Sequence, residues 1–332
     1  MSALVIGTRG SALALWQANA VASALREAHE GLRVEVRTVT TTGDRVLDRP
    51  LADIGDKGLF TKELEDLLLD GAVDLCVHSM KDLPSQLPAG CALVGMLPRA
   101  DVRDALVCGP RMQGARSLAD VPAGARIGTG SARRAAQLLA VNSQAVPTPM
   151  RGNVDTRLRK AAGPDYEGAI LAAAGLTRLG LQNRIAALIP VDQMIPAPGQ
   201  GAVGVEARAG DERVQSLVDA VRDRRTEACV NAERRILAAL DGGCQAPLGA
   251  FIRFEDADDG AAADAERFLA LDAAVLSADG AQCVRARLRR ACGGDADAGA
   301  LALDLAQEAI ELLLKGGARQ LLRPCADQGG AR

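Results

Sequence analysis

The densest group of reactive side chains in the sequence follows a short apolar run at residues 74–77. Residues 78–84 read HSMKDLP. In open α/β sheets, ligands bind beyond the carboxyl ends of the strands, so Ser79, Lys81 and Asp82 are expected to face a crevice. A carboxylate fixed there can stabilise positive charge and relay protons. A neighbouring lysine and aspartate also form ordinary surface ion pairs, and the segment alone leaves that alternative open.

Cys244 is a second candidate, because it lies in the glycine turn 242–247, which reads GGCQAP. A thiol on such a turn is sterically accessible, as a nucleophile or a covalent anchor must be. The alternative is a small buried hydrophobic residue, which we prefer for every other cysteine of the chain. With eight scattered cysteines, no Cys-x-x-Cys pair and only two histidines, we expect no metal site.

Three segments combine a glycine turn with arginine at an expected helix start. They are 7–11 (GTRGS), 128–134 (GTGSARR) and 151–157 (RGNVDTR). Helix N-termini expose unpaired N–H groups, glycine lets an anion approach the backbone, and arginine adds a two-pronged donor. For one such loop, a serine or asparagine that merely caps the helix is the simpler interpretation. Three loops together favour several carboxylate or phosphate contacts.

Residues 56–60, DKGLF, follow a polar run that begins at Gly43 and is punctuated by glycine. This composition suits a flap that closes over a ligand, with Lys57 and Phe60 facing inward. An ordinary surface loop with Phe60 anchored in the core fits the same residues equally well.

The segments between these loops alternate short apolar runs with amphipathic stretches. Leu13, Trp16, Ala20 and Ala24 recur at helical spacing. The expected strands are 3–7, 34–40, 74–77, 105–108, 126–128 and 168–171, and the expected helices include 61–70, 131–139 and 153–161. This βαβ order predicts a mostly parallel sheet covered by helices.

Residues 190–201 are rich in proline and glycine, which suggests a hinge or a crossover. After residue 226 the pattern changes to a helix, grouped strands and a last helix, which indicates a small α+β domain. Its expected elements are helix 226–240, strands 246–252, 267–276 and 282–290, and helix 298–315. The acidic segment 256–266 is expected to be a surface insertion, and we assign no role to it or to the C-terminal tail.

The composition limits the classes of partner that this protein is expected to bind. The chain has 332 residues, a net charge of −3, one Trp, one Tyr and four Phe. It lacks the basic field and stacking surfaces that nucleic acid or an anionic membrane would need, so neither is an expected partner. No segment reads as a signal peptide or offers ~20 consecutive apolar residues, so we expect a cytoplasmic protein with free thiols.

Taken together, these segments resemble the porphobilinogen deaminase (hydroxymethylbilane synthase) family over roughly residues 4–323. The matching segments, in order, are 8–11, 15–17, 57–60, 78–84, 128–134, 151–158, 197–202 and 242–247. Many ordered matches are far more specific than one short motif. The resemblance implies two lobes like those of periplasmic binding proteins, with a third small α+β domain. The implied division is 1–100 plus 200–220 for the first lobe, 101–199 for the second and 221–332 for the third domain.

The resemblance also implies the chemistry. Family members are transferases that join four porphobilinogen molecules, with loss of ammonia, into linear hydroxymethylbilane on a covalently bound dipyrromethane. By the match, Cys244 carries this cofactor through a thioether, Asp82 stabilises the cation formed on ammonia loss, and Lys57 and Phe60 belong to the flap. The implied carboxylate-binding residues are Arg9, Ser11, Lys81, Thr129, Ser131, Arg133, Arg134, Arg151, Arg157 and Arg178. Gly130 departs from the family, which often has serine there. The family is expected to be monomeric.

Two other classes stay open on the residues alone. A non-catalytic, two-lobed anion-binding protein would use the same loops, but it would not require Asp82 or Cys244. An enzyme acting on a phosphorylated metabolite would need a metal or a base constellation, which the sequence does not offer.

Overall fold

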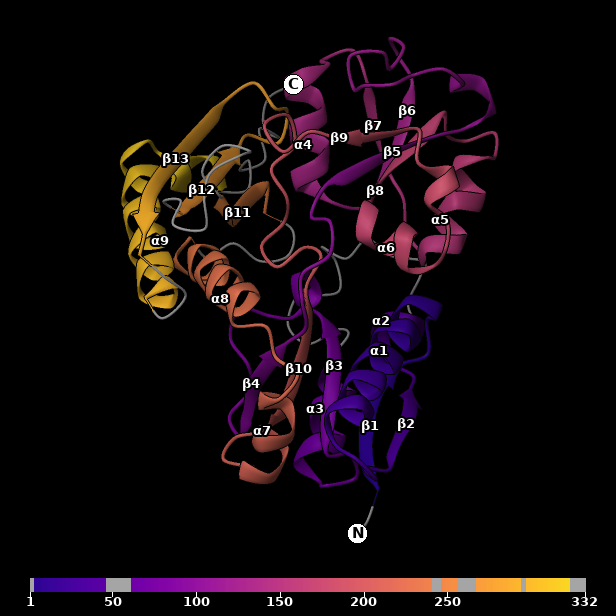
Figure 1. Ribbon diagram of the computed structural model, residues 1–332. Helices are drawn as coiled ribbons and strands as arrows, with labels where there is room; N and C mark the ends of the chain where they lie inside the picture. The colour runs from indigo at the N-terminus through magenta and orange to yellow at the C-terminus, as the bar shows by residue number, and fades with distance from the viewer. Residues whose placement is uncertain (1–2, 46–60, 241–245, 256–266, 294–296, 323–332) are drawn as a thin grey trace, which may run out of the picture.

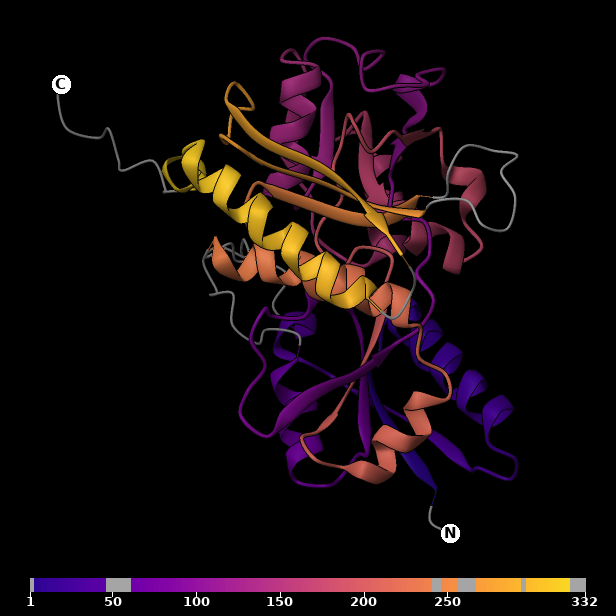
Figure 2. The ribbon, with the colours of Figure 1, turned by 60° about the vertical axis from the view of Figure 1, so that its left-hand side comes forward.

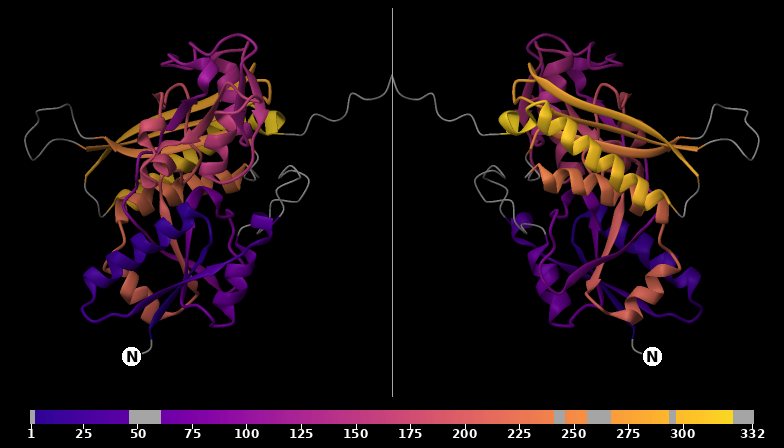
Figure 3. Two further views of the ribbon diagram at one scale, coloured as in Figure 1. Left: turned by 90° about the vertical axis from the view of Figure 1, so that its right-hand side faces the viewer. Right: turned by 90° about the vertical axis from the view of Figure 1, so that its left-hand side faces the viewer.

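The computed structural model describes residues 3–45, 61–240, 246–255, 267–293 and 297–322, and these form three sheets (Figure 1). Lys57, Phe60, Cys244 and the insertion 256–266 lie outside the described residues. Figure 3 shows the first sheet at one end of the molecule and the other two sheets at the opposite end.

The first sheet has the order β2-β1-β3-β10-β4. Its strands are β1 (Leu4–Arg9), β2 (Val34–Val39), β3 (Leu75–Ser79), β4 (Cys91–Met96) and β10 (Val203–Arg208). β1 is parallel to β2 and β3, and β10 is antiparallel to both of its neighbours. The accompanying helices are α1 (Ala12–Ala28), α2 (Thr42–Arg45), α3 (Lys62–Leu69) and α7 (Glu212–Asp219). β10 thus returns to this sheet from far along the chain, and the remaining strands share one direction, as the sequence predicts.

Helix α1 forms where the sequence predicts it, but the apolar stripe chosen there does not mark its buried face. Ala18, Val21 and Leu25 are fully buried, whereas Trp16 is 40% exposed. The helix is rich in alanine and leucine around its circumference, so the apolar spacing does not single out one side.

The second sheet repeats the plan of the first, in the order β7-β6-β8-β5-β9. Its strands are β5 (Asp104–Cys108), β6 (Arg126–Thr129), β7 (Val146–Pro149), β8 (Gly168–Ala172) and β9 (Ala187–Ile189). β6 is parallel to β7 and β8, and β5 is antiparallel to β8 and β9. Helices α4 (Ala132–Val141), α5 (Val154–Ala161) and α6 (Ala173–Arg178) follow β6, β7 and β8. Two such sheets with a third, smaller unit confirm the expected α/β fold class.

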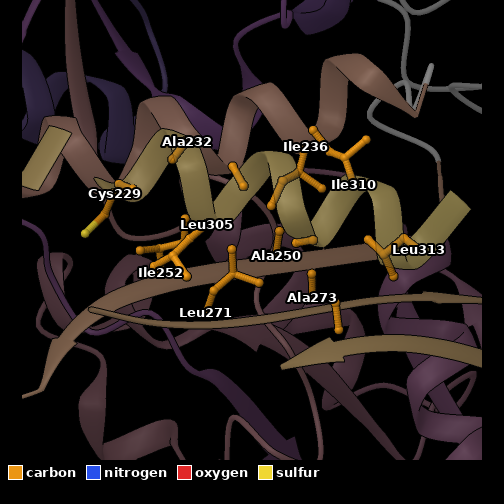
Figure 4. Packing of buried hydrophobic residues seen from close by; sticks show 14 of the residues in the cluster. Cys229, Ala232, Ile236, Ala250, Ile252, Leu271, Ala273, Leu305, Ile310 and Leu313 are labelled. Carbon is orange, nitrogen blue, oxygen red and sulfur yellow. The ribbon is translucent and has the colours of Figure 1, made fainter. Parts of the chain in front are cut away.

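The third sheet is antiparallel and consists of β11 (Leu248–Glu255), β12 (Arg267–Leu276) and β13 (Cys283–Cys292). Helices α8 (Arg224–Ala239) and α9 (Ala298–Lys315) cover one face of it, and α10 (Ala318–Leu322) follows (Figure 2). Ile236, Leu271 and Leu305 meet in the core between them (Figure 4). Alanines on both helices let the backbones approach closely, so this α+β unit has its own core.

The three sheets meet at Glu233 of α8, which is fully buried. Its carboxylate accepts hydrogen bonds from Arg99 Nη1 at 2.7 Å, from the Gly199 amide at 2.7 Å and from the Ile252 amide at 2.8 Å. Arg99 and Gly199 lie in the two connections between the first and second sheets, and Ile252 lies in β11. One carboxylate therefore joins both connections to the third unit.

Candidate active site

A cavity of about 1030 Å³ lies at the carboxyl ends of the parallel strands, between the first and second sheets. The loops after β1, β3, β6, β7 and β8 all contribute to its wall. Every predicted site residue within the described part of the chain lines it. These are Arg9, Ser11, Lys81, Asp82, Thr129, Ser131, Arg133, Arg134, Arg151, Arg157 and Arg178.

Asp82 ends the 3₁₀ turn η2 (Met80–Asp82) directly after β3, and it is exposed to the cavity. Met80 anchors this turn because its side chain is 1% exposed. A Cβ atom at Gly204 in β10 would lie 2.1 Å from Met80 Sδ, so only glycine leaves room for this anchor. Strand β10 thus fixes the position of the turn from which Lys81 and Asp82 enter the cavity.

Lys81 lies within the cationic part of the cavity. Burial and the nearby Arg134 guanidinium lower the pKa of Lys81 to about 8, against the opposing effect of Asp82. Burial and Arg134 likewise lower the pKa of Arg157 to about 10. The positive charges are therefore crowded and partly desolvated, which favours binding of carboxylates that relieve the crowding.

Arg133 and Arg134 are already paired inside the protein with Asp104, the first residue of β5. Arg133 Nη1 lies 2.8 Å from Asp104 Oδ2, and Arg134 Nη2 lies 2.7 Å from Asp104 Oδ1. Burial acts to raise the pKa of Asp104, but the two guanidinium groups outweigh it and hold that pKa well below its usual range. Arg133 also donates to the Ile195 carbonyl at 2.7 Å. Asp104 was not predicted from the sequence, although a charge at the start of an apolar strand was the available signal.

The helix starts combine the two interpretations that the sequence left open. Ser11 Oγ accepts from the Ala14 amide at 3.3 Å, Ser131 Oγ from the Arg134 amide at 3.4 Å, and Asn153 Oδ1 from the Thr156 amide at 3.0 Å. These residues cap α1, α4 and α5, and all three also line the cavity. Three helix N-termini, each with its positive dipole end, therefore point anion-binding groups at one space.

Several contacts that support the cavity wall were not predicted from the sequence. Gln17 Nε2 donates to Ser79 Oγ at 2.8 Å, which links α1 to β3. Gln200 Nε2 donates to Asp104 Oδ1 at 3.0 Å. Arg178, at the end of α6, donates to the Gly201 carbonyl at 2.7 Å, and its Cζ atom lies 5.2 Å from the centre of the Trp16 ring. These contacts join segments that are distant in the chain, so no local sequence pattern predicts them.

Gly130, the departure from the family pattern, has a local explanation. A Cβ atom there would lie 2.9 Å from the Met150 carbonyl oxygen. The loop after β6 thus packs directly on the loop after β7, and glycine relieves this contact while the capping role stays with Ser131.

The geometry defines a class of protein: a two-lobed α/β protein whose interlobe cavity gathers many cationic side chains around the Asp82 carboxylate. Such a cavity suits a ligand with several carboxylates on which positive charge develops. Among the described residues no cluster of His, Cys, Asp and Glu could hold a metal ion. No helix in the part of the chain that the structure describes is long and apolar enough to cross a membrane.

Comparison with known proteins assigns the family. Residues 4–216 match the model for the dipyrromethane cofactor binding domain of porphobilinogen deaminase, and residues 227–311 match the model for its C-terminal domain. The porphobilinogen deaminase of Syntrophotalea carbinolica is 47% identical over 97% of this chain and 95% of its own length. That of Roseiflexus sp. (strain RS-1) is 52% identical over 76% of this chain and 82% of its own. The chain belongs to the porphobilinogen deaminase family.

It is accordingly a transferase that polymerises four porphobilinogen molecules, with release of ammonia, into hydroxymethylbilane on a dipyrromethane primer. This assignment decides against the two other classes that the sequence alone left open. Solved structures with some similarity include the periplasmic aliphatic sulphonate binding protein SsuA from Escherichia coli, with a TM-score of 0.41 and 12% identity. The likeness covers 74% of this chain and 76% of that chain.

The cavity fits the dipyrromethane by the chemistry of its donors. Each pyrrole ring carries an acetate and a propionate, so two rings bring four carboxylates. The described wall offers arginine, lysine and hydroxyl donors on both sides of the space. These groups match carboxylate acceptors in kind and in charge.

Proposed function

We propose that Asp82 is the catalytic carboxylate of the polymerisation. The observation that carries this proposal is the position of Asp82, which enters a cavity otherwise rich in cations. Ammonia loss leaves an electron-deficient methylene conjugated with a pyrrole, and a fixed anion nearby stabilises the developing positive charge. The same carboxylate can accept a hydrogen bond from the pyrrole N–H.

We further propose roles for the individual cationic side chains. Arg9, Lys81, Arg151, Arg157 and Arg178 bind carboxylates of the growing chain, with Ser11, Thr129 and Ser131 as hydroxyl donors. Arg133 and Arg134 share the negative charge of Asp104, and we assign both to carboxylate binding as well. Lys57 and Phe60, outside the described residues, are proposed to belong to a flap.

Cys244 is proposed as the attachment point of the dipyrromethane. When bound, this group supplies the pyrrole carbon to which the first substrate unit is joined. The glycine turn around Cys244 follows α8, whose Glu233 is tied to the crossover at Gly199 next to the cavity. This contact between α8 and a residue of the cavity wall supports the proposal.

The test of the attachment site is the mass of the denatured protein, with peptide mapping of any excess over the sequence mass. We expect an excess equal to one dipyrromethane on the peptide that contains Cys244, and its loss in Cys244→Ser. Cys91→Ser is the control, because burial and nearby Glu206 raise the pKa of Cys91 to about 11 and keep its thiol protonated. Equal loss of the excess in both variants would contradict the assignment.

We also propose that the first lobe comprises residues 1–100 plus 200–220, the second 101–199 and the third domain 221–332. The membership of β10 in the first sheet supports this division. The protein is proposed to act as a cytoplasmic monomer on porphobilinogen, without nucleic acid or membrane partners. Light scattering after size-exclusion chromatography tests the monomer, and a mass near twice the 34.4 kDa of the chain would contradict it.

A further inference from the structure

A buried histidine lies in β3, just before the residues of the active-site turn. His78 is 6% exposed, and its Nε2 atom lies 2.9 Å from Glu206 Oε2. Glu206 is in the adjacent strand β10 and is fully buried. A buried carboxylate against one ring nitrogen fixes both the orientation and the tautomer of an imidazole.

His78 reaches the active site through a small side pocket. This pocket of about 70 Å³ is lined in part by His78, Ser79 and Asp82. It also shares Arg9, Ser11 and Asp82 with the large cavity, so the two spaces adjoin. Since a water molecule needs about 10–15 Å³ of such space and several polar partners, the side pocket has room for ordered water.

The ring of His78 has one nitrogen left for that water. Nε2 is taken by Glu206, and no hydrogen bond to Nδ1 occurs among the described residues. With Nε2–H donating to the carboxylate, Nδ1 is an acceptor. A base oriented by a buried carboxylate is the arrangement that proteins use for proton transfer.

The polymerisation creates a need for such a group. For each C–C bond formed, the attacking pyrrole carbon must lose its hydrogen as a proton so that the C–H electron pair restores the aromatic ring. If Asp82 takes this proton, the carboxylate is neutral and cannot stabilise the next cation until the proton has left. The arginine guanidinium groups that line the cavity do not accept protons, so a further acceptor close to Asp82 would speed the removal of this proton.

We propose that His78, oriented by Glu206, regenerates the Asp82 carboxylate through a water molecule in the side pocket. The O–H bond of protonated Asp82 breaks as its proton passes to the water, which gives one of its own protons to Nδ1 of His78. The resulting imidazolium, paired with Glu206, then gives its Nδ1 proton to water that enters the side pocket from the large cavity. His78 is in this scheme a positioning and relay residue, and the inference rests on the role proposed for Asp82.

The other charged groups that face His78 come from several elements. Glu206 lies on β10, Glu65 on α3, and Arg9 and Asp82 line the side pocket. Burial, followed by a weaker effect of Glu206, raises the pKa of Glu65, while the nearby Thr61 hydroxyl lowers it. Carboxyl groups thus outnumber cationic groups in the described surroundings of the imidazole.

The first experiment compares His78→Gln with the wild type and with His29→Gln. The introduced glutamine amide can still donate to Glu206, so shape and hydrogen bond are retained while proton acceptance is lost. We expect kcat to fall by about 100-fold or more, with KM nearly unchanged and the thermal midpoint retained. His29, which contacts the Leu217 carbonyl at the far end of α1, should tolerate the change.

Full turnover by His78→Gln in an assay where the wild type is active would overturn this inference alone. Absence of turnover in the wild type itself would instead overturn the proposed function together with it. A second measurement does not depend on activity. Because the chain has only two histidines, ¹⁵N labelling of histidine gives two sets of ring signals, and His29→Gln assigns them. We expect the Nε2–H tautomer for neutral His78, and an Nδ1–H tautomer would contradict the relay.

Discussion

Individual side chains set the electrostatics of this active site, and Asp82 is the clearest case. It enters the cavity at the end of a turn whose anchor is the neighbouring Met80 rather than Asp82 itself. Its removal should therefore affect charge more than structure. Lys81 differs, because its charge depends on the pH of the solution within the range in which enzymes are assayed.

Asp82→Ala should lower kcat by about 100-fold or more, because the fixed anion that stabilises the cationic intermediate is lost. Folding and the mass excess on the Cys244 peptide should be retained. Steady-state kinetics together with the intact mass check both parts. Substantial residual turnover would remove Asp82 from its proposed role.

Binding of porphobilinogen should weaken as the pH rises through about 8. Lys81, whose pKa is about 8, is cationic below that pH and neutral above it, so its attraction for a carboxylate is present at pH 7 and lost in alkali. Calorimetry with an Asp82→Asn variant measures the affinity without turnover. Because the Asp82 carboxylate raises the pKa of Lys81, the transition in this variant should lie below that of the wild type. Lys81→Met is the matched control and should bind weakly at every pH. Equal pH dependence in the two proteins would contradict the prediction.

At the scale of helices and strands, the sequence predicted the central strands because their apolar runs follow glycine loops with recognisable chemistry. It did not reveal β7, whose residues 146–149 read VPTP. Proline cannot donate to a sheet and is confined to edges, and β7 is an edge strand. Local patterns also could not place β10 beside β3, since the paired residues Val203 and Ser79 are far apart in sequence. Only the family resemblance predicted that residues 200–220 return to the first lobe.

The candidate site, like the fold, was predicted from the sequence in part. The cations and Asp82 stand in loops with strong local signatures, and they do line one cavity. Gln17 and Glu206 act through partners on other elements, so their types and spacing carried no signal. Asp104 offered only a charge at the start of an apolar strand. Sequence motifs thus indicate groups that face a ligand, whereas the residues that hold those groups become visible only in three dimensions.

The close contact between β10 and η2 gives a prediction at this scale. Gly204→Ala would place a methyl group against Met80 Sδ and displace the turn that carries Lys81 and Asp82. We expect a loss of about 1–3 kcal/mol in the free energy of unfolding, together with lower kcat. Gly299→Ala on α9 has open space around it and should leave both unchanged or improved. Denaturant unfolding and steady-state kinetics of the two variants test these expectations. Equal stability and kcat in the two variants would contradict them.

At the scale of the whole molecule, Glu233 connects all three sheets, and its loss should affect the protein as a unit. Glu233→Ala leaves the nearly buried Arg99 without its counter-charge, which should cost about 3–5 kcal/mol in stability. Glu308→Ala, which removes an exposed ion pair with Arg290, should cost less than about 1 kcal/mol. Denaturant titrations compare the two, and similar midpoints would contradict the role of Glu233 as a junction.

The return of β10 to the first sheet also has a consequence for synthesis on the ribosome. All strands of the second sheet lie between residues 104 and 189, so this unit can be completed while later residues are still being made. The first sheet begins earlier but has an unfilled position between β3 and β4 until residue 208 has left the exit tunnel. Since domains fold largely as units during translation, the N-terminal lobe should be the later of the two to close. During that interval its exposed strand edges are the part of the nascent chain that most needs chaperone protection.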